Sequence, residues 1–206
     1  MKNTKLWVII GSLAALLIVV VVSLAVWGIS AYNSLTTLDV NVENAWSNVE
    51  TQYQRRMDLI PNLVNTVKGY SAHESQTLEK VTNARAGLTT ALDNARSASG
   101  QGPDDVEQFQ KSQASLNKAL GLYINAVHEA YPDLKANTNF LDLQTQLEGT
   151  ENRISTARRD YNEMVKDYNT RVRRFPTNLI APMMGFETRK PFEADAGADN
   201  APTVQF

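Results

Sequence analysis

Residues 140–172, FLDLQTQLEGTENRISTARRDYNEMVKDYNTRV, place apolar side chains at alternating steps of three and four. An α-helix completes a turn every 3.6 residues, so side chains at these steps share one face. The positions on that face are Phe140, Leu143, Leu147, Thr150, Ile154, Ala157, Tyr161, Met164, Tyr168 and Val172. A stripe of this length predicts a long helix that packs against other helices, as in a bundle.

Three further stripes with the same spacing precede this one. They run from Leu35 to Val67, from Leu78 to Ala95 and from Phe109 to Tyr131. Between the first two lies Gly69-Tyr70-Ser71, a weak turn signal, and a reversal there and one continuous helix both stay open. The segment SASGQGPDD at 97–105 predicts a clear loop before the third helix.

Helix-breaking residues set the remaining boundaries. Pro132 ends the third helix and Pro176 ends the fourth, because a proline interrupts the hydrogen-bond ladder of a helix. Thr138 or Asn139 is predicted to cap the start of the fourth helix. With a reversal near Gly69, the fold class is all-α: an N-terminal transmembrane helix followed by an elongated antiparallel four-helix up-and-down bundle.

The first thirty residues differ from the rest in being almost wholly apolar. Residues 6–29, LWVIIGSLAALLIVVVVSLAVWGI, contain no charge, and ~24 helical residues span ~36 Å, enough to cross a ~30 Å hydrocarbon core. Trp7 and Trp27 stand near its two ends, where interfacial aromatic residues belong. A cleaved signal peptide and a buried core helix are the alternatives. The run exceeds the ~7–15 apolar residues of a signal peptide and is apolar all round, which favours an uncleaved anchor.

The charges that flank the apolar run predict its direction across the membrane. Lys2 and Lys5 precede it, whereas the first charges after it are Asp39 and Glu43. Basic residues favour the cytoplasmic side. The sequence therefore predicts a single-pass protein of the cell (inner) membrane, with a cytoplasmic N-terminus and a periplasmic or extracellular bundle.

These boundaries predict a five-part organisation. Residues 1–5 form a short cytoplasmic stub, residues 6–30 the transmembrane helix and residues 31–176 the bundle. Residues 177–192 form an apolar and basic extension, and residues 193–206 have the composition of a disordered tail.

The end of the fourth helix joins basic residues to an apolar segment. An even number of antiparallel helices returns the chain to the membrane side, where Arg171, Arg173, Arg174 and Phe175 precede NLIAPMMGF at 178–186. Basic residues beside apolar ones suit an interface with anionic lipid headgroups. The favoured alternative is that apolar side chains of this segment fold back and close the end of the bundle. These side chains are Leu179, Ile180, Met183, Met184 and Phe186.

Composition excludes several kinds of chemistry. The chain has no cysteine, which removes disulfides and thiolate metal sites, and its net charge of −2 does not suit a nucleic-acid-binding protein. Its two histidines, His73 and His128, do not make a zinc site and are predicted to be exposed helix residues. No phosphate loop, dinucleotide fingerprint or hydrolase motif occurs. No catalytic, cofactor-binding or metal-binding residue is predicted.

Two charge groups are the most noticeable polar features. Arg55 and Arg56 lie next to Asp58, and Arg158 and Arg159 lie next to Asp160. They indicate either a buried polar network or ligand groove, or solvated helix faces with weak ion pairs, and the second interpretation is favoured.

A glycine and several aromatic residues are candidates for helix packing. Gly149 costs about 1 kcal/mol in mid-helix relative to alanine, so we expect a neighbouring helix to approach closely there, at Trp46 or Tyr53. Tyr161 and Tyr168 lie on the apolar stripe. The tyrosines on or beside the stripes are predicted to pack in the core with their hydroxyls at the rim, rather than to line a groove for a partner. They are Tyr53, Tyr70, Tyr123, Tyr161 and Tyr168.

Several strings are more specific than periodicity requires. The strings ENAWSNVETQYQRRMDLIPNLVNTVKGYSAHE, LEKVTNAR and YPDLKANTNFLDLQTQLEGTENRISTARRDYNEMVKDYNTRVRRFPTNLIA closely resemble the LemA family of bacterial membrane proteins. The resemblance covers about residues 32–192. It implies an antiparallel helical bundle behind one transmembrane helix. It implies no enzymatic activity, and no catalytic residue can be carried over.

These observations favour a non-enzymatic scaffold of the cell envelope. Long apolar helix faces held in one orientation at a membrane favour self-assembly, so a homo-oligomer is expected, with another envelope protein as a further partner. The alternative is a membrane-surface sensor or remodelling factor that uses the basic and apolar end of the bundle. No nucleic acid and no cofactor is expected.

Overall fold

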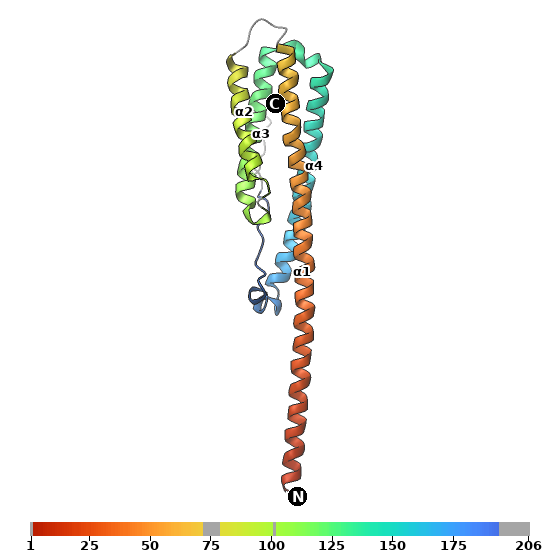
Figure 1. The fold of residues 1–206 in the computed structure, drawn as a ribbon. Helices are drawn as coiled ribbons and strands as arrows, with labels where there is room; N and C mark the ends of the chain where they lie inside the picture. Colours follow the sequence, from red (N-terminus) through yellow and green to blue (C-terminus); the bar gives the residue numbers. More distant parts are fainter. Residues whose placement is uncertain (1, 72–78, 101, 194–206) are drawn as a thin grey trace, which may run out of the picture. The chain divides into compact units, whose positions relative to one another are not determined.

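The computed structural model describes residues 2–71, 79–100 and 102–193, with the side chains of residues 2–6, 8 and 9 left aside. Its described part contains the helices α1 (Lys2–Ser71), α2 (Glu79–Ala98), α3 (Val106–Ala130) and α4 (Thr138–Arg173), and no strand (Figure 1). Short 3-10 turns lie at Pro103–Asp105, Pro132–Ala136, Thr177–Leu179 and Pro182–Met184. The predicted all-α fold class is confirmed.

Backbone contacts divide the chain into two compact units. Met1–Asn41 and Asp167–Thr188 form one, here called the N-terminal unit, and Val42–Lys166 with Arg189–Phe206 forms the other, the bundle unit. Helices α1 and α4 each contribute residues to both units.

In the bundle unit, α2 runs back along α1. The backbone N–H of Gly100, just after α2, donates a 2.9 Å hydrogen bond to Oε1 of Glu50, in the middle of α1. At the opposite end, Val67 of α1 and Val81 of α2 line the same small pocket. Helices α1 and α2 therefore run in opposite directions, which excludes one continuous helix. The residues Gly69-Tyr70-Ser71 are the last part of α1, so the turn signal does not mark a turn at these positions.

Contacts of α1 also set the directions of α3 and α4. The rings of Trp46 and Phe109 lie 5.1 Å apart, and those of Tyr70 and Tyr131 lie 6.0 Å apart, so α3 runs parallel to α1. Trp46 also contacts Tyr161, near the far end of α4, at 5.5 Å. Helix α4 is antiparallel to α1, since residue 56 contacts residue 151, earlier in α4. The four helices alternate in direction, as the up-and-down topology requires.

The predicted stripes form the core of the bundle unit. Its most deeply buried side chains come from all four helices: Met57, Leu63, Ala95, Leu116, Tyr123, Val127, Phe140 and Tyr161. One position on α4 was predicted wrongly, because Val165 is buried while Met164 is only partly buried. Both lie at helical steps from Tyr161 and Tyr168, so spacing alone does not separate them.

The helix boundaries follow the predicted breakers closely. Helix α2 ends inside the predicted loop, α3 ends before Pro132, and α4 ends at Arg173, before Pro176. The predicted cap of α4 is wrong by one residue or two. Asn137 precedes the helix and its Oδ1 accepts a 3.2 Å hydrogen bond from the backbone N–H of Phe140, which is how an N-cap side chain acts.

Helix α1 has no break at residue 30, where the membrane segment and the bundle were predicted to meet. After Gly28 no glycine or proline follows until Pro61, so the sequence contains no helix breaker at this junction. The hydroxyls of Thr36 and Thr37 donate to the carbonyl oxygens four residues earlier, at 3.0 and 2.9 Å. The two predicted segments are therefore one uninterrupted helix.

Candidate functional site

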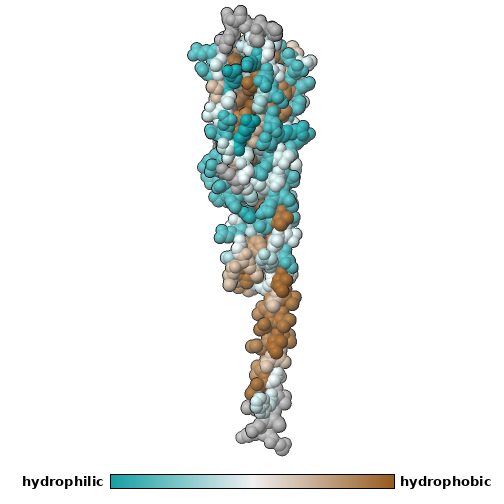
Figure 2. All heavy atoms as spheres, in the orientation of Figure 1, coloured by the Kyte–Doolittle hydropathy of each residue, from teal (hydrophilic) through white to brown (hydrophobic). Residues whose placement is uncertain are grey.

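The apolar part of α1 is exposed on all sides in the N-terminal unit. Every residue from Ile10 to Val26 is exposed, and Trp7 is 72% exposed. Figure 2 shows apolar side chains along this part of the chain. Within the described residues, one helix is long and apolar enough to cross a membrane, and it contains this stretch. A helix that satisfies its own backbone and shows only apolar side chains suits a hydrocarbon environment, so it is compatible with a single-pass anchor.

Next to this stretch lies the segment that follows α4. The ring of Phe186 packs edge-on against Tyr32 at 5.5 Å, three residues beyond Ile29. Phe186 is buried, as the fold-back interpretation predicts, and Ala181 is buried as well. Leu179 and Met183 are exposed, so the fold-back interpretation is wrong for these two side chains. Contact of this segment with lipid stays a prediction.

The exposed face of this segment combines charge with apolar surface. Phe175 is 75% exposed, Leu179 62% and Met183 86%. Arg173 and Arg174 are exposed beside them, and Arg171 is half-buried. We call Phe175, Leu179 and Met183 the apolar turn. Trp27, predicted at the membrane interface, is partly exposed.

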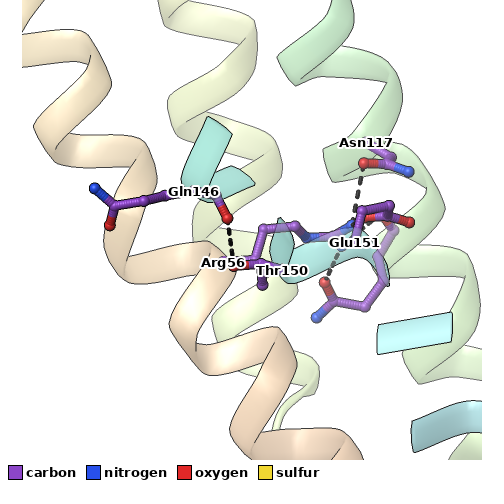
Figure 3. Close-up of polar contacts among 6 residues, drawn as sticks. Arg56, Asn117, Gln146, Thr150 and Glu151 are labelled. Carbon is purple, nitrogen blue, oxygen red and sulfur yellow. Dashed lines mark hydrogen bonds and ion pairs between the residues drawn. The ribbon is translucent and has the colours of Figure 1, made fainter. Parts of the chain in front are cut away.

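In the bundle unit, a buried arginine joins three helices. Arg56 of α1 is 2% exposed (Figure 3). Its Nη1 donates to Oδ1 of Asn117 at 3.1 Å and to Oε2 of Glu151 at 3.0 Å. Its Nη2 donates to Oε1 of Gln113 at 2.8 Å. We call Arg56, Gln113, Asn117 and Glu151 the arginine network.

This network constrains the register of the helices. A buried cation is costly without partners, and here the partners lie on α3 and α4 at positions that only one alignment brings together. The guanidinium also lies 4.9 Å from the centre of the Tyr53 ring. Since the Glu151 side chain is 49% exposed, the ion pair itself is partly solvated. The network is therefore more a determinant of register than a source of net stability.

The other predicted charge groups lie on the surface. Arg55 and Asp58 are exposed, and Asp58 accepts a 2.8 Å hydrogen bond from Gln54. Arg159 and Asp160 form an exposed pair at 3.8 Å. Solvated helix faces thus describe Arg55, Asp58 and the Arg159–Asp160 pair. Arg158 is partly buried, and the buried-network interpretation describes Arg56. Its position three residues after Tyr53 and four before Ile60, within the apolar stripe, is the sequence signal that separates it from Arg55.

An aromatic groove on the bundle unit holds the segment Arg189–Glu193, here called the strap. Phe192 is 5% exposed and stacks on Trp46 with ring centres 5.7 Å apart and planes at 12°. Tyr161 and Phe109 meet the same ring edge-on at 5.4 and 6.4 Å. We call Trp46, Phe109 and Tyr161 the aromatic groove.

Two side-chain amides pair with the strap's backbone. Asn162 accepts from the N–H of Phe192 at 2.8 Å and donates to its carbonyl oxygen at 3.0 Å. Gln110 accepts from the N–H of Glu193 at 3.2 Å and donates to its carbonyl oxygen at 2.9 Å. Sequence reasoning missed this site, because the strap has no periodicity and its partners lie on α1, α3 and α4.

The predicted packing residues divide into two groups. Trp46, Tyr53, Tyr161 and Tyr168 are all buried, each with at most 3% exposure. The close helix approach expected at Gly149 is wrong, because a Cβ built there meets nothing within 4 Å. No atom of a neighbouring helix lies near the position that a Cβ of residue 149 would take.

Replacing Gly149 with alanine should therefore stabilise the protein. Alanine favours the helix by about 0.5–1 kcal/mol over glycine and here meets no steric obstacle. Chemical denaturation of the full-length protein in detergent measures the change. The matched control is Gly185→Ala, which should destabilise the protein by about 1–2 kcal/mol, because Gly185 has a left-handed φ of +83°. A loss of stability in Gly149→Ala would contradict the open environment of that residue.

Core tyrosines make stability sensitive to alkaline pH. Burial raises the pKa of Tyr123 to about 12, from an ordinary value of 10. Between these values the unfolded chain releases this proton and the folded protein keeps it, so stability falls as pH rises from about 10 to about 12. We expect Tyr123→Phe to lose less stability than the wild type between pH 8 and 11 in denaturation curves. Equal losses would contradict the burial of this hydroxyl.

His128 was predicted to be exposed and is partly buried. His128 lies on α3, its ring edge-on to Phe140 at 5.8 Å, and partial burial lowers its pKa. His73 lies outside the described residues, as does the tail from residue 194. Among the residues that the structure describes, no group of three or more His, Asp or Glu side chains is placed to hold a metal ion.

The fold defines an all-α protein, a four-helix bundle whose first helix carries an exposed apolar stretch. Comparison with known proteins identifies the family. A model of the LemA family matches residues 45–206. The chain belongs to the LemA family. The resemblance seen in the sequence is thereby confirmed.

Individual relatives agree with this assignment. Magnetosome protein MamQ 1 of Paramagnetospirillum magneticum is 29% identical over 182 residues, covering 82% of this chain and 66% of that protein. Protein LemA of Metamycoplasma hominis is 28% identical over 167 residues, covering 79% of this chain and 68% of the relative. Magnetosome protein MamQ of Magnetospirillum gryphiswaldense is 24% identical over 187 residues. The chain spans just under two thirds of the length of the MamQ relatives.

Proposed function

We propose that this chain is a membrane-tethered, non-enzymatic scaffold of the cell envelope that works by assembling with copies of itself. Helix α1 anchors it, with the N-terminus in the cytoplasm and the bundle outside. The observation that carries this proposal is the exposed apolar stretch of α1, continuous with a bundle whose register is fixed internally.

Self-assembly is supported by the tether that the proposal gives to each copy. A single-pass anchor confines all copies to two dimensions, which raises their effective concentration. The MamQ relatives are named magnetosome proteins, which assigns those relatives to the magnetosome of their own organisms. A scaffold that organises a membrane surface accounts for both observations, with another envelope protein as an additional partner.

The test is to count copies in native membranes. Full-length protein is extracted with its surrounding lipid in polymer-bounded particles and weighed by single-particle mass measurement. The proposal predicts particles that contain multiples of the 22.9 kDa chain. A known monomeric single-pass protein, expressed to the same level, is the control for chance co-extraction. Particles with one copy each would contradict the proposed self-assembly.

A second function is favoured by the apolar turn. Phe175, Leu179 and Met183 are exposed beside Arg173 and Arg174, and this segment packs next to the end of the apolar run. Exposed apolar side chains joined to basic ones bind the interface of an anionic bilayer. In this alternative the protein senses or remodels the membrane surface through the apolar turn.

A probe at the apolar turn tests this second function. The chain has no cysteine, so Leu179→Cys in the full-length protein accepts a single fluorophore. In vesicles with spin-labelled lipid, contact with the bilayer quenches this fluorophore, and anionic lipid increases the quenching. Lys118→Cys, on the exposed side of α3, is the matched control and stays bright. Equal fluorescence at both positions would exclude a membrane role for the turn.

A further inference from the structure

We infer that the aromatic groove is a binding site for an extended peptide segment, and that in the assembly it takes the strap, Arg189–Glu193, of a second copy. This inference rests on the proposed self-assembly and names the contact that produces it. The occupant is identified by the segment that fills the groove within the chain itself.

The groove recognises the backbone of an extended segment. Asn162 and Gln110 each pair with both the N–H and the carbonyl oxygen of one strap residue. Two more side chains donate to carbonyl oxygens of the strap. The Tyr161 hydroxyl donates to the carbonyl oxygen of Lys190 at 3.1 Å, and Arg158 donates to the carbonyl oxygen of Glu193 at 2.8 Å. Side chains that saturate the backbone of an unstructured segment act as a sheet edge does for an added strand.

One aromatic side chain provides the specificity of the groove. The Phe192 ring stacks on Trp46, and the guanidinium of Arg158 lies 5.2 Å from its centre. This encloses the ring between an aromatic plane and a cation, an arrangement that favours aromatic over aliphatic side chains.

Charge complementarity extends the recognition by two residues. Arg189 forms an ion pair with Asp104, in the 3-10 turn before α3. Lys190 Nζ lies 3.8 Å from Oε2 of Glu107, in the first turn of α3. The ligand class is therefore an extended segment with two basic residues followed, two positions later, by an aromatic one. In this chain that segment is RKPFE.

In the assembly, the occupant of the groove is the strap of a second copy. Residues 186–193 have no helix or strand of their own, and the contacts above involve only the strap and the bundle unit. A groove that accepts this segment from its own chain accepts the identical segment from a neighbour, which is how exchanged elements build oligomers. Confinement in a membrane supplies that neighbour at high effective concentration.

Disulfide trapping between differently tagged copies tests the exchange. One full-length copy carries Gln110→Cys and the other Glu193→Cys, and the two are produced together in the same membranes. The backbone nitrogen of Glu193 lies 3.2 Å from Oε1 of Gln110, so a strap that lies in a groove brings residues 110 and 193 together. We expect a disulfide-linked mixed dimer. Phe192→Ala in the second copy should reduce its yield at least tenfold.

Two control experiments and a second pair of cysteines accompany the disulfide trapping. Lys118→Cys paired with Glu193→Cys reports random collision, since Lys118 is exposed on α3 two turns away. Glu107→Cys with Lys190→Cys, bridged by a short bismaleimide, leaves both amides in place. A single chain that carries Gln110→Cys and Glu193→Cys measures binding within one chain.

The outcomes separate this inference from the proposed function. A mixed dimer above the collision control supports exchange. Cross-linking only within single chains overturns it, and cross-linking in neither arrangement overturns it as well, because the groove then holds some other ligand. If multi-copy lipid particles persist in either case, self-assembly stands through another surface. If the particles hold single copies, self-assembly itself fails.

Discussion

Replacing Arg56 with alanine should lower the free energy of unfolding by about 3–5 kcal/mol, the largest loss expected for any single polar residue in the bundle. The change removes the donor that Gln113, Asn117 and Glu151 share. It leaves the Gln113 amide oxygen buried without its partner and opens a cavity beside Tyr53. Denaturant titration of the full-length protein, followed by helical circular dichroism, measures the loss.

The neighbouring arginine provides a matched control. Arg55 has the same chemistry but is exposed, so Arg55→Ala should change stability by less than about 0.5 kcal/mol. Arg56→Met with Gln113→Leu replaces the buried polar pair with apolar groups and should recover most of the loss. Equal effects at residues 55 and 56 would contradict the burial of Arg56.

Placing two arginines in the apolar stretch should release the protein from the membrane. Leu17→Arg with Val21→Arg puts two cations on one helix face near the centre of the stretch, where each costs about 3 kcal/mol of insertion free energy. We expect most of the double variant to fail membrane integration and to be recovered in the soluble fraction after an alkaline wash, or to be degraded.

The control tests whether the effect depends on the position rather than on added charge. Leu122 is 58% exposed on α3, so Leu122→Arg should leave the protein in the membrane pellet. Retention of the double variant in the pellet, at wild-type level, would show that some other part of the chain binds the membrane.

Helical periodicity predicted most of the bundle. The stripes through Val49, Leu88, Leu116 and Ile154 are buried as expected, since spacing determines which side chains share a helix face. Prolines and the glycine-rich loop marked the helix ends for an equally local reason. Periodicity does not choose between adjacent residues at the edge of a stripe, which is why Val165 replaces Met164.

Features that depend on contacts between distant residues were harder to predict. Arg56 and Arg55 are the same residue type side by side, and only the partners on α3 and α4 make Arg56 buried. Gly149 predicted that a neighbouring helix lies close to α4 at this residue, and in the structure none does. The strap was beyond sequence reasoning because Phe192 acquires its site only when Trp46 and Tyr161 come together.

The core tyrosines show that burial could be predicted from spacing but the hydrogen bonds of their hydroxyls could not. Tyr123, Tyr161 and Tyr168 were predicted in the core and are fully buried. Tyr161 additionally hydrogen-bonds the strap through its hydroxyl, a role that burial alone does not imply. Hydrophobic spacing therefore does not predict the partner of a tyrosine hydroxyl.

The most direct test of the proposed anchoring uses the absence of cysteine from this chain. Single thiols are introduced before the apolar stretch, as Asn3→Cys, and on the bundle, as Lys118→Cys, and intact cells are treated with a membrane-impermeant maleimide. The account predicts a full-length protein in the membrane pellet, labelled at residue 118 and labelled at residue 3 only after lysis. Labelling of residue 3 in intact cells, or a bundle shortened at its N-terminus and found in the soluble fraction, would contradict it.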